Sequence, residues 1–255
     1  MKQDQRTAIF LYGVAAYVAF LAVFLYAIGF IGNFGVPKSL DSAPTAAWHV
    51  ALMTDLALLS LFAIQHSVMA RPFFKRWLTR LVPTAAERST YVLASSIALA
   101  VLFWKWEPLG GIVWQFESAG GRVAMYAAYC FGWGLVLFST FVINHFDLFG
   151  LRQVWRSFRG KAAESLPFTV PLLYRIVRHP LYVGWLFCFW STPVMTVSHL
   201  FFAAITTAYI LAAIPLEEAD LMKEHPEYRA YRKQVPMLVP RVPVAYGEMS
   251  SVEQR

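Results

Sequence analysis

The sequence predicts an all-α integral membrane protein with about five to six transmembrane helices, a C-terminal helical hairpin and a cytoplasmic tail. Three observations lead to this fold class. Of the 255 residues, 58% are hydrophobic and only 15% are charged, whereas soluble domains have about 25% charged residues. Long apolar runs match the roughly 20 residues that an α-helix needs to cross a bilayer. Lysine and arginine gather in alternate loops between these runs, which is typical of membrane topology.

The predicted spans are the apolar runs taken in chain order. They cover residues 8–31, 46–70, 91–104, 123–143 and 181–216. The third run is short, and the last is too long for one helix yet barely long enough for two. Because Pro193 lies near the middle of the last run, we expect a helical hairpin there, made of two short spans or of a re-entrant pair. The whole chain, residues 1–255, is expected to form a single transmembrane domain.

The distribution of positive charge predicts how these spans face. Of the 22 lysine and arginine residues, all except Lys38, Lys105 and Arg122 lie in the N-terminal segment, in the loops after the second and fourth runs, or in the tail. Under the positive-inside rule these segments share the cytoplasmic side, together with both termini. The net charge of +7 is therefore explained by topology. Membrane lipids are expected partners, and nucleic acid is not.

Polar side chains near the cytoplasmic ends of two spans form a first candidate site. His66 lies near the end of the second run, and Asn144, His145 and Asp147 follow the fourth. At similar depth in the membrane, these groups can form a small polar pocket in which an imidazole accepts a proton. The four residues are therefore candidates for proton transfer.

Structural roles remain open for the same residues. His66 can satisfy a neighbouring helix by hydrogen bonding. Residues 144–147 can cap one helix and lead into an interfacial helix that puts Arg152 and Arg156 on lipid phosphates. A histidine set that includes His49 could hold a haem or a metal, but no close-spaced pair of ligands supports it. We therefore predict no metal site.

A second candidate site surrounds the last apolar run. Residues 178–184 read Arg-His-Pro-Leu-Tyr-Val-Gly. Pro180 suits the first position of a helix, whose free amide donors attract negative charge, and Gly184 allows another helix or a ligand to approach the backbone closely. At the other end of the run, Glu217 and Glu218 return to the same side of the membrane. This arrangement suggests a site for a zwitterionic ligand with hydroxyl groups and a positive centre.

Two further elements follow the acidic pair. Tyr228 and Tyr231 are three residues apart, which places them on one face of a helix. Residues 235–240 read Val-Pro-Met-Leu-Val-Pro and form an extended segment bounded by prolines. We expect this segment to cover the site as a lid.

This ordered combination of motifs resembles the membrane methyltransferases related to isoprenylcysteine carboxyl methyltransferase and to phospholipid N-methyltransferases. The resemblance covers residues 171–240. The N-terminal half narrows the resemblance to one group, the methanethiol S-methyltransferases. The similar motifs are Gln65-His66-Ser67, Arg71-Pro72, residues 144–147 and residues 150–153. That group neighbours the membrane proteins associated with nitrite and nitric oxide reductase, and its members make dimethyl sulfide from methanethiol with S-adenosylmethionine.

The resemblance implies a role for each motif. Residues 171–240 would bind S-adenosylmethionine, and the helices in residues 1–150 would shape the acceptor pocket. The implied cofactor-binding residues are Arg178, His179, Tyr182, Gly184, Glu217, Glu218, Tyr228 and Tyr231. Either glutamate would hold the ribose or the methionyl ammonium group. His225-Pro226-Glu227 departs from the Phe-Gly pair of many relatives, so the turn there is expected to differ.

The expected reaction is the S-methylation of a small volatile thiol, methanethiol, to give dimethyl sulfide and S-adenosylhomocysteine, in a bacterial inner membrane. Because a thiol attacks as its thiolate, His66 or His145, oriented by Asp147 or Asn144, is the expected base. Two alternatives stay open. The acceptor could be a lipid or a lipidated cysteine, or the chain could be a non-enzymatic membrane protein of nitrogen-oxide metabolism that carries haem.

Overall fold

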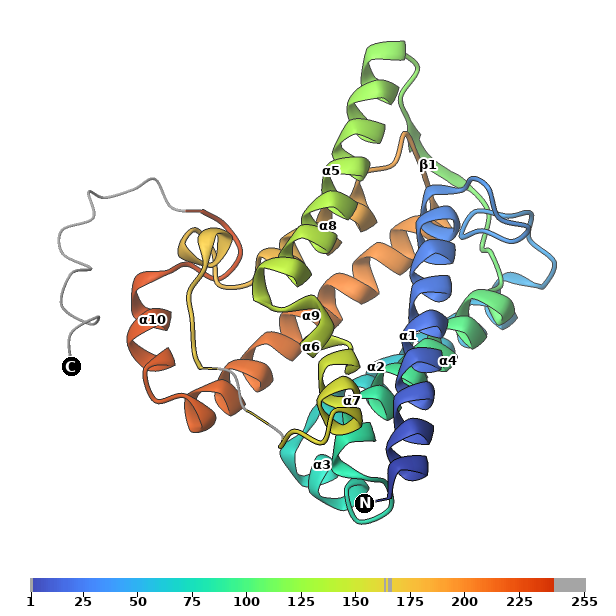
Figure 1. Cartoon of the computed structure of the whole chain (residues 1–255). Helices are drawn as coiled ribbons and strands as arrows, with labels where there is room; N and C mark the ends of the chain where they lie inside the picture. The colour runs from blue at the N-terminus through green and yellow to red at the C-terminus, as the bar shows by residue number, and fades with distance from the viewer. Residues whose placement is uncertain (1, 163, 165–166, 241–255) are drawn as a thin grey trace.

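The computed structural model describes residues 2–162, 164 and 167–240 and is almost entirely helical (Figure 1). Its elements are α1 (Gln3–Gly32), α2 (Trp48–Ala70), α3 (Pro72–Leu78), η1 (Thr84–Ala86), α4 (Glu87–Lys105), β1 (Ile112–Gln115), α5 (Ala119–Ile143), α6 (His145–Leu148), α7 (Leu151–Phe158), η2 (Leu172–Arg175), α8 (Pro180–Trp190), β2 (Val194–Thr196), α9 (Val197–Glu224) and α10 (Tyr228–Gln234). Among the described residues, α1, α2, α4, α5 and α9 are long and apolar enough to cross a membrane. The predicted all-α membrane fold is confirmed.

The two ends of the bundle differ in charge. At the end that we call the basic end, α7 packs beside the first half of α1, and α3 follows α2 (Figure 1). There Arg71, just after α2, forms an ion pair with Asp220 near the end of α9, with Nη1 2.8 Å from Oδ2. The loops after α1, α4 and α8 lie at the opposite end, which we call the far end.

The predicted hairpin is present, but its two arms are unequal. α8 has 11 residues and α9 has 28. At about 1.5 Å per residue, α8 reaches roughly 16 Å, about half of the hydrocarbon core, whereas α9 can cross it completely. The hairpin itself is confirmed, but neither expected form of it, two short spans or a re-entrant pair, matches these lengths, because one arm is half-length and the other is full-length. The other spans keep their predicted positions. α1, α4 and α5 begin earlier than predicted, at Gln3, Glu87 and Ala119, whereas α2 begins two residues later, at Trp48.

A short antiparallel sheet joins the turn of the hairpin to the loop after α4. Strands β1 and β2 pair with Ile112 opposite Thr196 and Gln115 opposite Val194. These strands could not be predicted from the sequence, because they are four and three residues long and too short to display an alternating pattern.

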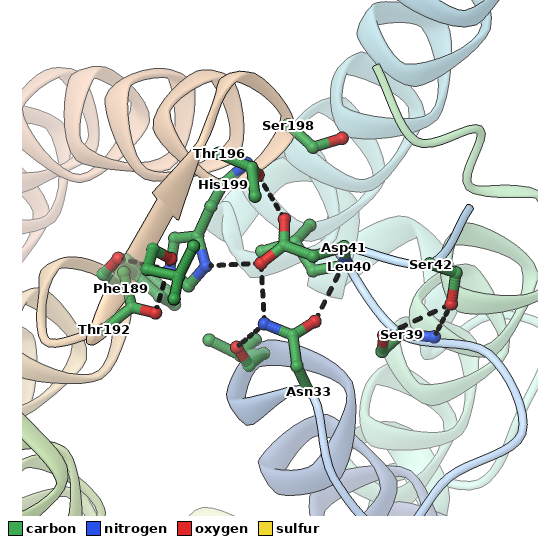
Figure 2. Close-up of polar contacts among 12 residues, drawn as sticks. Asn33, Ser39, Leu40, Asp41, Ser42, Phe189, Thr192, Thr196, Ser198 and His199 are labelled. Atoms are coloured by element: carbon green, nitrogen blue, oxygen red, sulfur yellow. Dashed lines mark hydrogen bonds and ion pairs between the residues drawn. The ribbon is translucent and has the colours of Figure 1, made fainter. Parts of the chain in front are cut away.

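A polar cluster, in which His199 is buried and Asn33 is exposed, fastens the loop after α1 to the start of α9 at the far end (Figure 2). The carboxylate of Asp41 accepts hydrogen bonds from the Asn33 amide, at 2.6 Å, and from the Thr196 hydroxyl. The Nδ1 atom of His199 lies 3.3 Å from the same carboxylate, and its Nε2 atom lies 2.9 Å from the carbonyl oxygen of Phe189. The His199 ring thus links the loop after α1 to the end of α8.

The apolar core lies between the helices, and lipid-facing side chains cover the outside. Aromatic and aliphatic side chains from different helices meet in the core, among them Phe30, Leu102, Trp106, Phe202 and Ile214. On the outside, Leu25, Ile64, Ile97 and Val123 are each more than half exposed. Such surfaces are expected on spans that lipid solvates.

Candidate functional site

The loop that leads into α8 is paired with the C-terminal segment. Pro180 begins α8 at its first position, where the lack of an N–H group costs no helical hydrogen bond. The backbone N–H groups of Arg178 and His179 donate to the carbonyl oxygens of Pro236 and Met237, at 2.8 and 3.2 Å. The segment predicted to act as a lid therefore lies against the start of the hairpin.

Glu218 is the centre of a buried ionic cluster. Its side chain is only 2% exposed. Its Oε1 atom accepts from Arg178 Nε at 2.6 Å and from Tyr228 Oη at 3.3 Å, and it lies 3.0 Å from His179 Nε2. Its Oε2 atom forms an ion pair with Arg232 Nε at 2.9 Å. Both oxygens are therefore occupied, as a buried carboxylate requires.

Arg178 extends this cluster to the end of α10. Its Nη1 atom donates to the carbonyl oxygens of Val235, at 2.6 Å, and Arg232, at 3.1 Å. One guanidinium thus joins α9, α10 and the segment that follows α10. These contacts hold the C-terminal segment in place, so Arg178 and Glu218 act together as a clasp.

Glu217, the next residue along α9, has a different environment. It is half-buried, and Tyr182 of α8 donates to its Oε2 atom at 2.8 Å. Within the part of the chain that the structure describes, this is the only hydrogen bond recorded for its side chain. The Glu217 carboxylate can therefore accept further hydrogen bonds, whereas both oxygens of Glu218 already have partners.

The tyrosines of α10 pack beside the clasp. The Tyr231 hydroxyl donates to the carbonyl oxygen of Tyr174 at 2.6 Å, and the ring centroids of Tyr228 and Tyr231 are 5.4 Å apart. Burial raises the pKa of both Tyr228 and Tyr231 above the ordinary value of a phenol. Both side chains therefore remain neutral hydrogen-bond donors.

His66 lies between α2 and α4, among side chains that can orient its ring. The Tyr91 hydroxyl is 2.9 Å from Nε2 and 3.0 Å from Nδ1, and Ser95 Oγ is 3.2 Å from Nδ1. The ring stacks on Phe62, with centroids 5.2 Å apart. The adjacent Gln65 donates to Ser95, but its Oε1 atom is buried with no partner among the described residues. This cluster has an acceptor oxygen available for another donor.

Contacts between α2 and α9 bring the His66 cluster near Glu217. Ser67 Oγ is 2.9 Å from the Tyr209 hydroxyl. Arg71 Nη1 donates to the carbonyl oxygen of Leu216, at 3.0 Å, as well as to Asp220. These contacts join the end of α2, which carries His66, to the part of α9 that carries Glu217.

His145 has partners on other helices. Its Nε2 atom is 2.8 Å from the Tyr17 hydroxyl, and its Nδ1 atom is 2.8 Å from Thr140 Oγ1. Since the Thr140 hydroxyl donates to the carbonyl oxygen of Leu137, Nδ1 carries the proton and Nε2 accepts from Tyr17. Phe141 stacks on the ring with centroids 4.3 Å apart. Burial lowers the pKa of His145.

The other two residues of this predicted group have local roles. The Asn144 side chain accepts from the N–H of Asp147 at 3.2 Å and caps α6. The Asp147 carboxylate forms an ion pair with Arg152 at 3.2 Å. His66 and His145 thus have separate partners. These contacts do not form the shared pocket that was expected for His66, His145, Asn144 and Asp147.

Gly184 is a helix-packing residue. A Cβ atom placed on it would come within 2.8 Å of the backbone nitrogen of Val136 and 3.0 Å of the carbonyl oxygen of Gly132. Gly132, in turn, would clash with the backbone of Cys188 if it carried a side chain. Of the two options left open by the sequence, close approach of a helix is the one observed, between α5 and α8.

Some residues of the site were missed from the sequence. Tyr91, Ser95 and Tyr209 lie inside spans, and Arg232 lies in α10. The first three each place a hydroxyl group inside an apolar run, and this polar group is the signal by which the sequence could have indicated them. Among residues 2–162, 164 and 167–240, no group of three histidine, cysteine or acidic residues is arranged to hold a metal ion.

Comparisons with known proteins place the chain among methyltransferases. The family described as "Protein of unknown function (DUF1295)" matches residues 110–235. A methanethiol S-methyltransferase of Crocosphaera subtropica is 56% identical over 236 residues, which cover 92% of this chain and 92% of the relative. One of Mycobacterium tuberculosis is 49% identical over 237 residues, covering 92% of this chain and 97% of the relative.

More distant relatives are also found. Nurim of Sus scrofa is 29% identical over 205 residues, covering 73% of this chain and 78% of the relative. No solved structure matches the chain. The similarity to the bacterial relatives extends over both halves of the chain, so it includes the helices that carry His66 as well as the hairpin.

Proposed function

Because the chain belongs to the methanethiol S-methyltransferase family, we propose that it transfers a methyl group from S-adenosylmethionine to methanethiol and forms dimethyl sulfide. The observation that carries this proposal is the identity of 56% and 49% to two such relatives over 92% of the chain. The similarity includes the acceptor-side helices, whereas a shared donor site alone would be confined to the C-terminal third.

We infer that the methyl donor binds where the start of α8 meets α9, beside Glu217. When bound, S-adenosylmethionine supplies a methyl group carried by a positively charged sulfur. Glu217 fits this ligand because its carboxylate accepts from Tyr182 alone among the described residues and can accept further hydrogen bonds from ribose hydroxyls or an ammonium group. Glu218 is the weaker candidate, because Arg178, His179, Tyr228 and Arg232 already occupy its oxygens.

Arg178, His179, Tyr228 and Tyr231 are assigned a supporting role in this proposal. The backbone N–H groups of Arg178 and His179 fix the segment that follows α10 against the start of the hairpin. Tyr228 and Tyr231 hold α10 beside it through their hydrogen bonds to Glu218 and Tyr174. A fixed cover excludes water from the site and so strengthens electrostatic interactions within it. Tyr182 would orient the Glu217 carboxylate toward the donor.

His66 is our candidate for the base. In its neutral form it would take the proton of the bound thiol, so that the sulfur attacks as a thiolate. Tyr91 and Ser95 would hold the imidazole ring in place through their contacts at 2.9–3.2 Å. The orphaned Oε1 atom of Gln65 could accept the S–H hydrogen before transfer. Most of the catalytic effect would come from aligning the acceptor sulfur with the methyl carbon.

The basic end is assigned to the cytoplasm of a bacterial inner membrane, with both termini on that side. The support is the gathering of lysine and arginine in the N-terminal segment, the loops at the basic end and the tail. This orientation gives the Glu217 region access to a donor made in the cytoplasm. A small apolar thiol would reach His66 through the bilayer.

Headspace gas chromatography of the purified protein tests the proposal. The protein in detergent is given S-adenosylmethionine with either methanethiol or a farnesylated cysteine peptide. We expect dimethyl sulfide from the first mixture and no methylated peptide from the second. The opposite result, with a methylated peptide and no dimethyl sulfide, would overturn the thiol assignment while keeping the methyltransferase.

A further inference from the structure

α7 has the pattern of an interfacial helix. Val154 is fully buried against Gly13 of α1, and the ring centroids of Trp155 and Phe158 lie 5.6 and 5.1 Å from that of Phe10. Trp155 is nonetheless 47% exposed. Helices with aromatic residues on one face and arginine on the other lie at the boundary between lipid and water. α7 therefore sits at the headgroup level of the basic end.

A hollow opens on the charged face of this helix. It has a volume of about 350 Å³ and is lined by Arg152, Trp155, Arg156, Arg159 and Lys161. The three arginines recur at intervals of four and three residues, so they share one face of α7. The Arg159 guanidinium lies 5.6 Å from the centroid of the Trp155 ring. This position keeps one cation at the rim of the hollow, above an aromatic surface.

A fifth cation reaches the same region from α1. Gly160 has a φ angle of +68°, and a Cβ atom on it would come within 2.7 Å of Arg6 Nη1. The Arg6 guanidinium therefore lies directly against the turn between Arg159 and Lys161. Glycine is suited to this turn both by its positive φ and by the close approach of the guanidinium.

The acidic groups described around the hollow do not balance these cations. Glu164 Oε2 is 2.7 Å from Arg156 and 3.2 Å from Arg152, and it is more than half exposed. Asp147 pairs with Arg152 alone, at 3.2 Å. Two carboxylates thus face five cations, so the hollow has net positive charge of about three. The charge suits an anion with several oxygen acceptors.

We propose that this hollow binds the phosphate of an anionic phospholipid, with the acyl chains beside Trp155 and Phe10. Arginine binds phosphate oxygens in pairs through its planar fork. Arg159 offers such a fork beside Lys161, whereas Arg152 and Arg156 are held by Asp147 and Glu164 and contribute mainly charge. A lipid is favoured over a soluble phosphate because the aromatic face of α7 adjoins the hollow at the membrane boundary. The lipid would brace α7 against α1. The site is independent of methyl transfer.

Native mass spectrometry of the full-length protein in detergent tests this site. Phosphatidylglycerol and phosphatidylcholine are titrated separately, and inorganic phosphate is added as a competitor in a third arm. The test variant is Arg159→Gln with Lys161→Gln, and the matched control is Arg76→Gln with Arg80→Gln, which removes two exposed cations from the same end of the protein. A second variant, Arg159→Lys with Lys161→Arg, keeps the charge.

We expect the wild-type protein to bind phosphatidylglycerol more tightly than phosphatidylcholine. Each neutralised cation should weaken phosphatidylglycerol binding roughly fivefold, so the test variant should lose roughly 25-fold, while the control and the charge-conserving variant remain near wild type. Equal binding of the two lipids, or an equal loss in the control variant, would overturn the site. Displacement of phosphatidylglycerol by millimolar phosphate would overturn the lipid assignment in favour of a soluble anion.

Discussion

Arg178 and Glu218 meet across the start of the hairpin, with Nε 2.6 Å from Oε1, in a buried contact that joins the loop before α8 to α9. The neighbouring Glu217 is left with a single tyrosine partner among the described residues. Two adjacent glutamates of the same helix thus have different contacts. One holds the fold of the C-terminal segment, and the carboxylate of the other can accept further hydrogen bonds.

Glu218→Gln should destabilise the protein. The change leaves the largely buried Arg178 without its counter-charge, which is expected to cost about 3 kcal/mol of unfolding free energy. Thermal unfolding in detergent measures the effect as a lower Tm. Glu224→Gln, at an exposed position of the same helix, is the matched control and should leave Tm unchanged. An equal Tm for both variants would contradict the role assigned to Glu218.

His66→Gln should lower kcat by roughly 100-fold at neutral pH, because the thiol loses its proton acceptor. The rate of this variant should rise with pH as more of the thiol ionises in solution, whereas the wild-type rate should change less. Steady-state kinetics with methanethiol across the pH range provide the measurement. His145→Gln is the matched control for loss of an imidazole. If His145→Gln, and not His66→Gln, shows the rescue by alkaline pH, the base has been misassigned.

The pH dependence of stability should include a contribution from His145. Burial lowers its pKa in the folded protein, so the unfolded chain takes up a proton first as the pH falls. Stability should therefore decrease as the pH drops below about 6.5, the ordinary value for histidine. Chemical denaturation at a series of pH values should show this loss in the wild-type protein and a smaller one in His145→Gln. Identical slopes for the two proteins would contradict the assignment.

Gly184→Ala should weaken the packing of α8 on α5. The added methyl group meets backbone atoms of Val136 and Gly132 at 2.8–3.0 Å, and overpacking of this kind costs about 1–3 kcal/mol. The control is Gly134→Ala, two residues after Gly132, because a Cβ atom there has nothing within 4 Å. Unfolding in detergent should separate the two variants. A stable Gly184→Ala protein that fails only in cofactor binding would instead indicate a ligand contact.

The positions of the spans and the motifs of the hairpin could be predicted from the sequence. A lipid environment demands long uncharged helices, so the positions of α1, α2 and α5 follow from composition alone. The unequal arms of the hairpin do not follow, because the length of α8 depends on where β2 pairs with β1.

The division of roles within the site also depends on tertiary contacts. Nothing in the local sequence separates Glu217 from Glu218, since the difference comes from Arg178 forty residues earlier and from Arg232 in α10. In the same way, His66 and His145 both lie near the end of an apolar run, so the sequence does not distinguish their roles. Their separate partners, Tyr91 for one and Tyr17 for the other, are set by which helices pack together.

Calorimetric binding of S-adenosylhomocysteine to the wild-type protein, Glu217→Gln and Glu224→Gln most directly tests the claim that the donor binds beside Glu217. The account predicts that Glu217→Gln binds at least about tenfold more weakly, as loss of a charged hydrogen-bond acceptor implies, with an unchanged Tm, while Glu224→Gln binds like the wild type. Wild-type affinity in Glu217→Gln would contradict it.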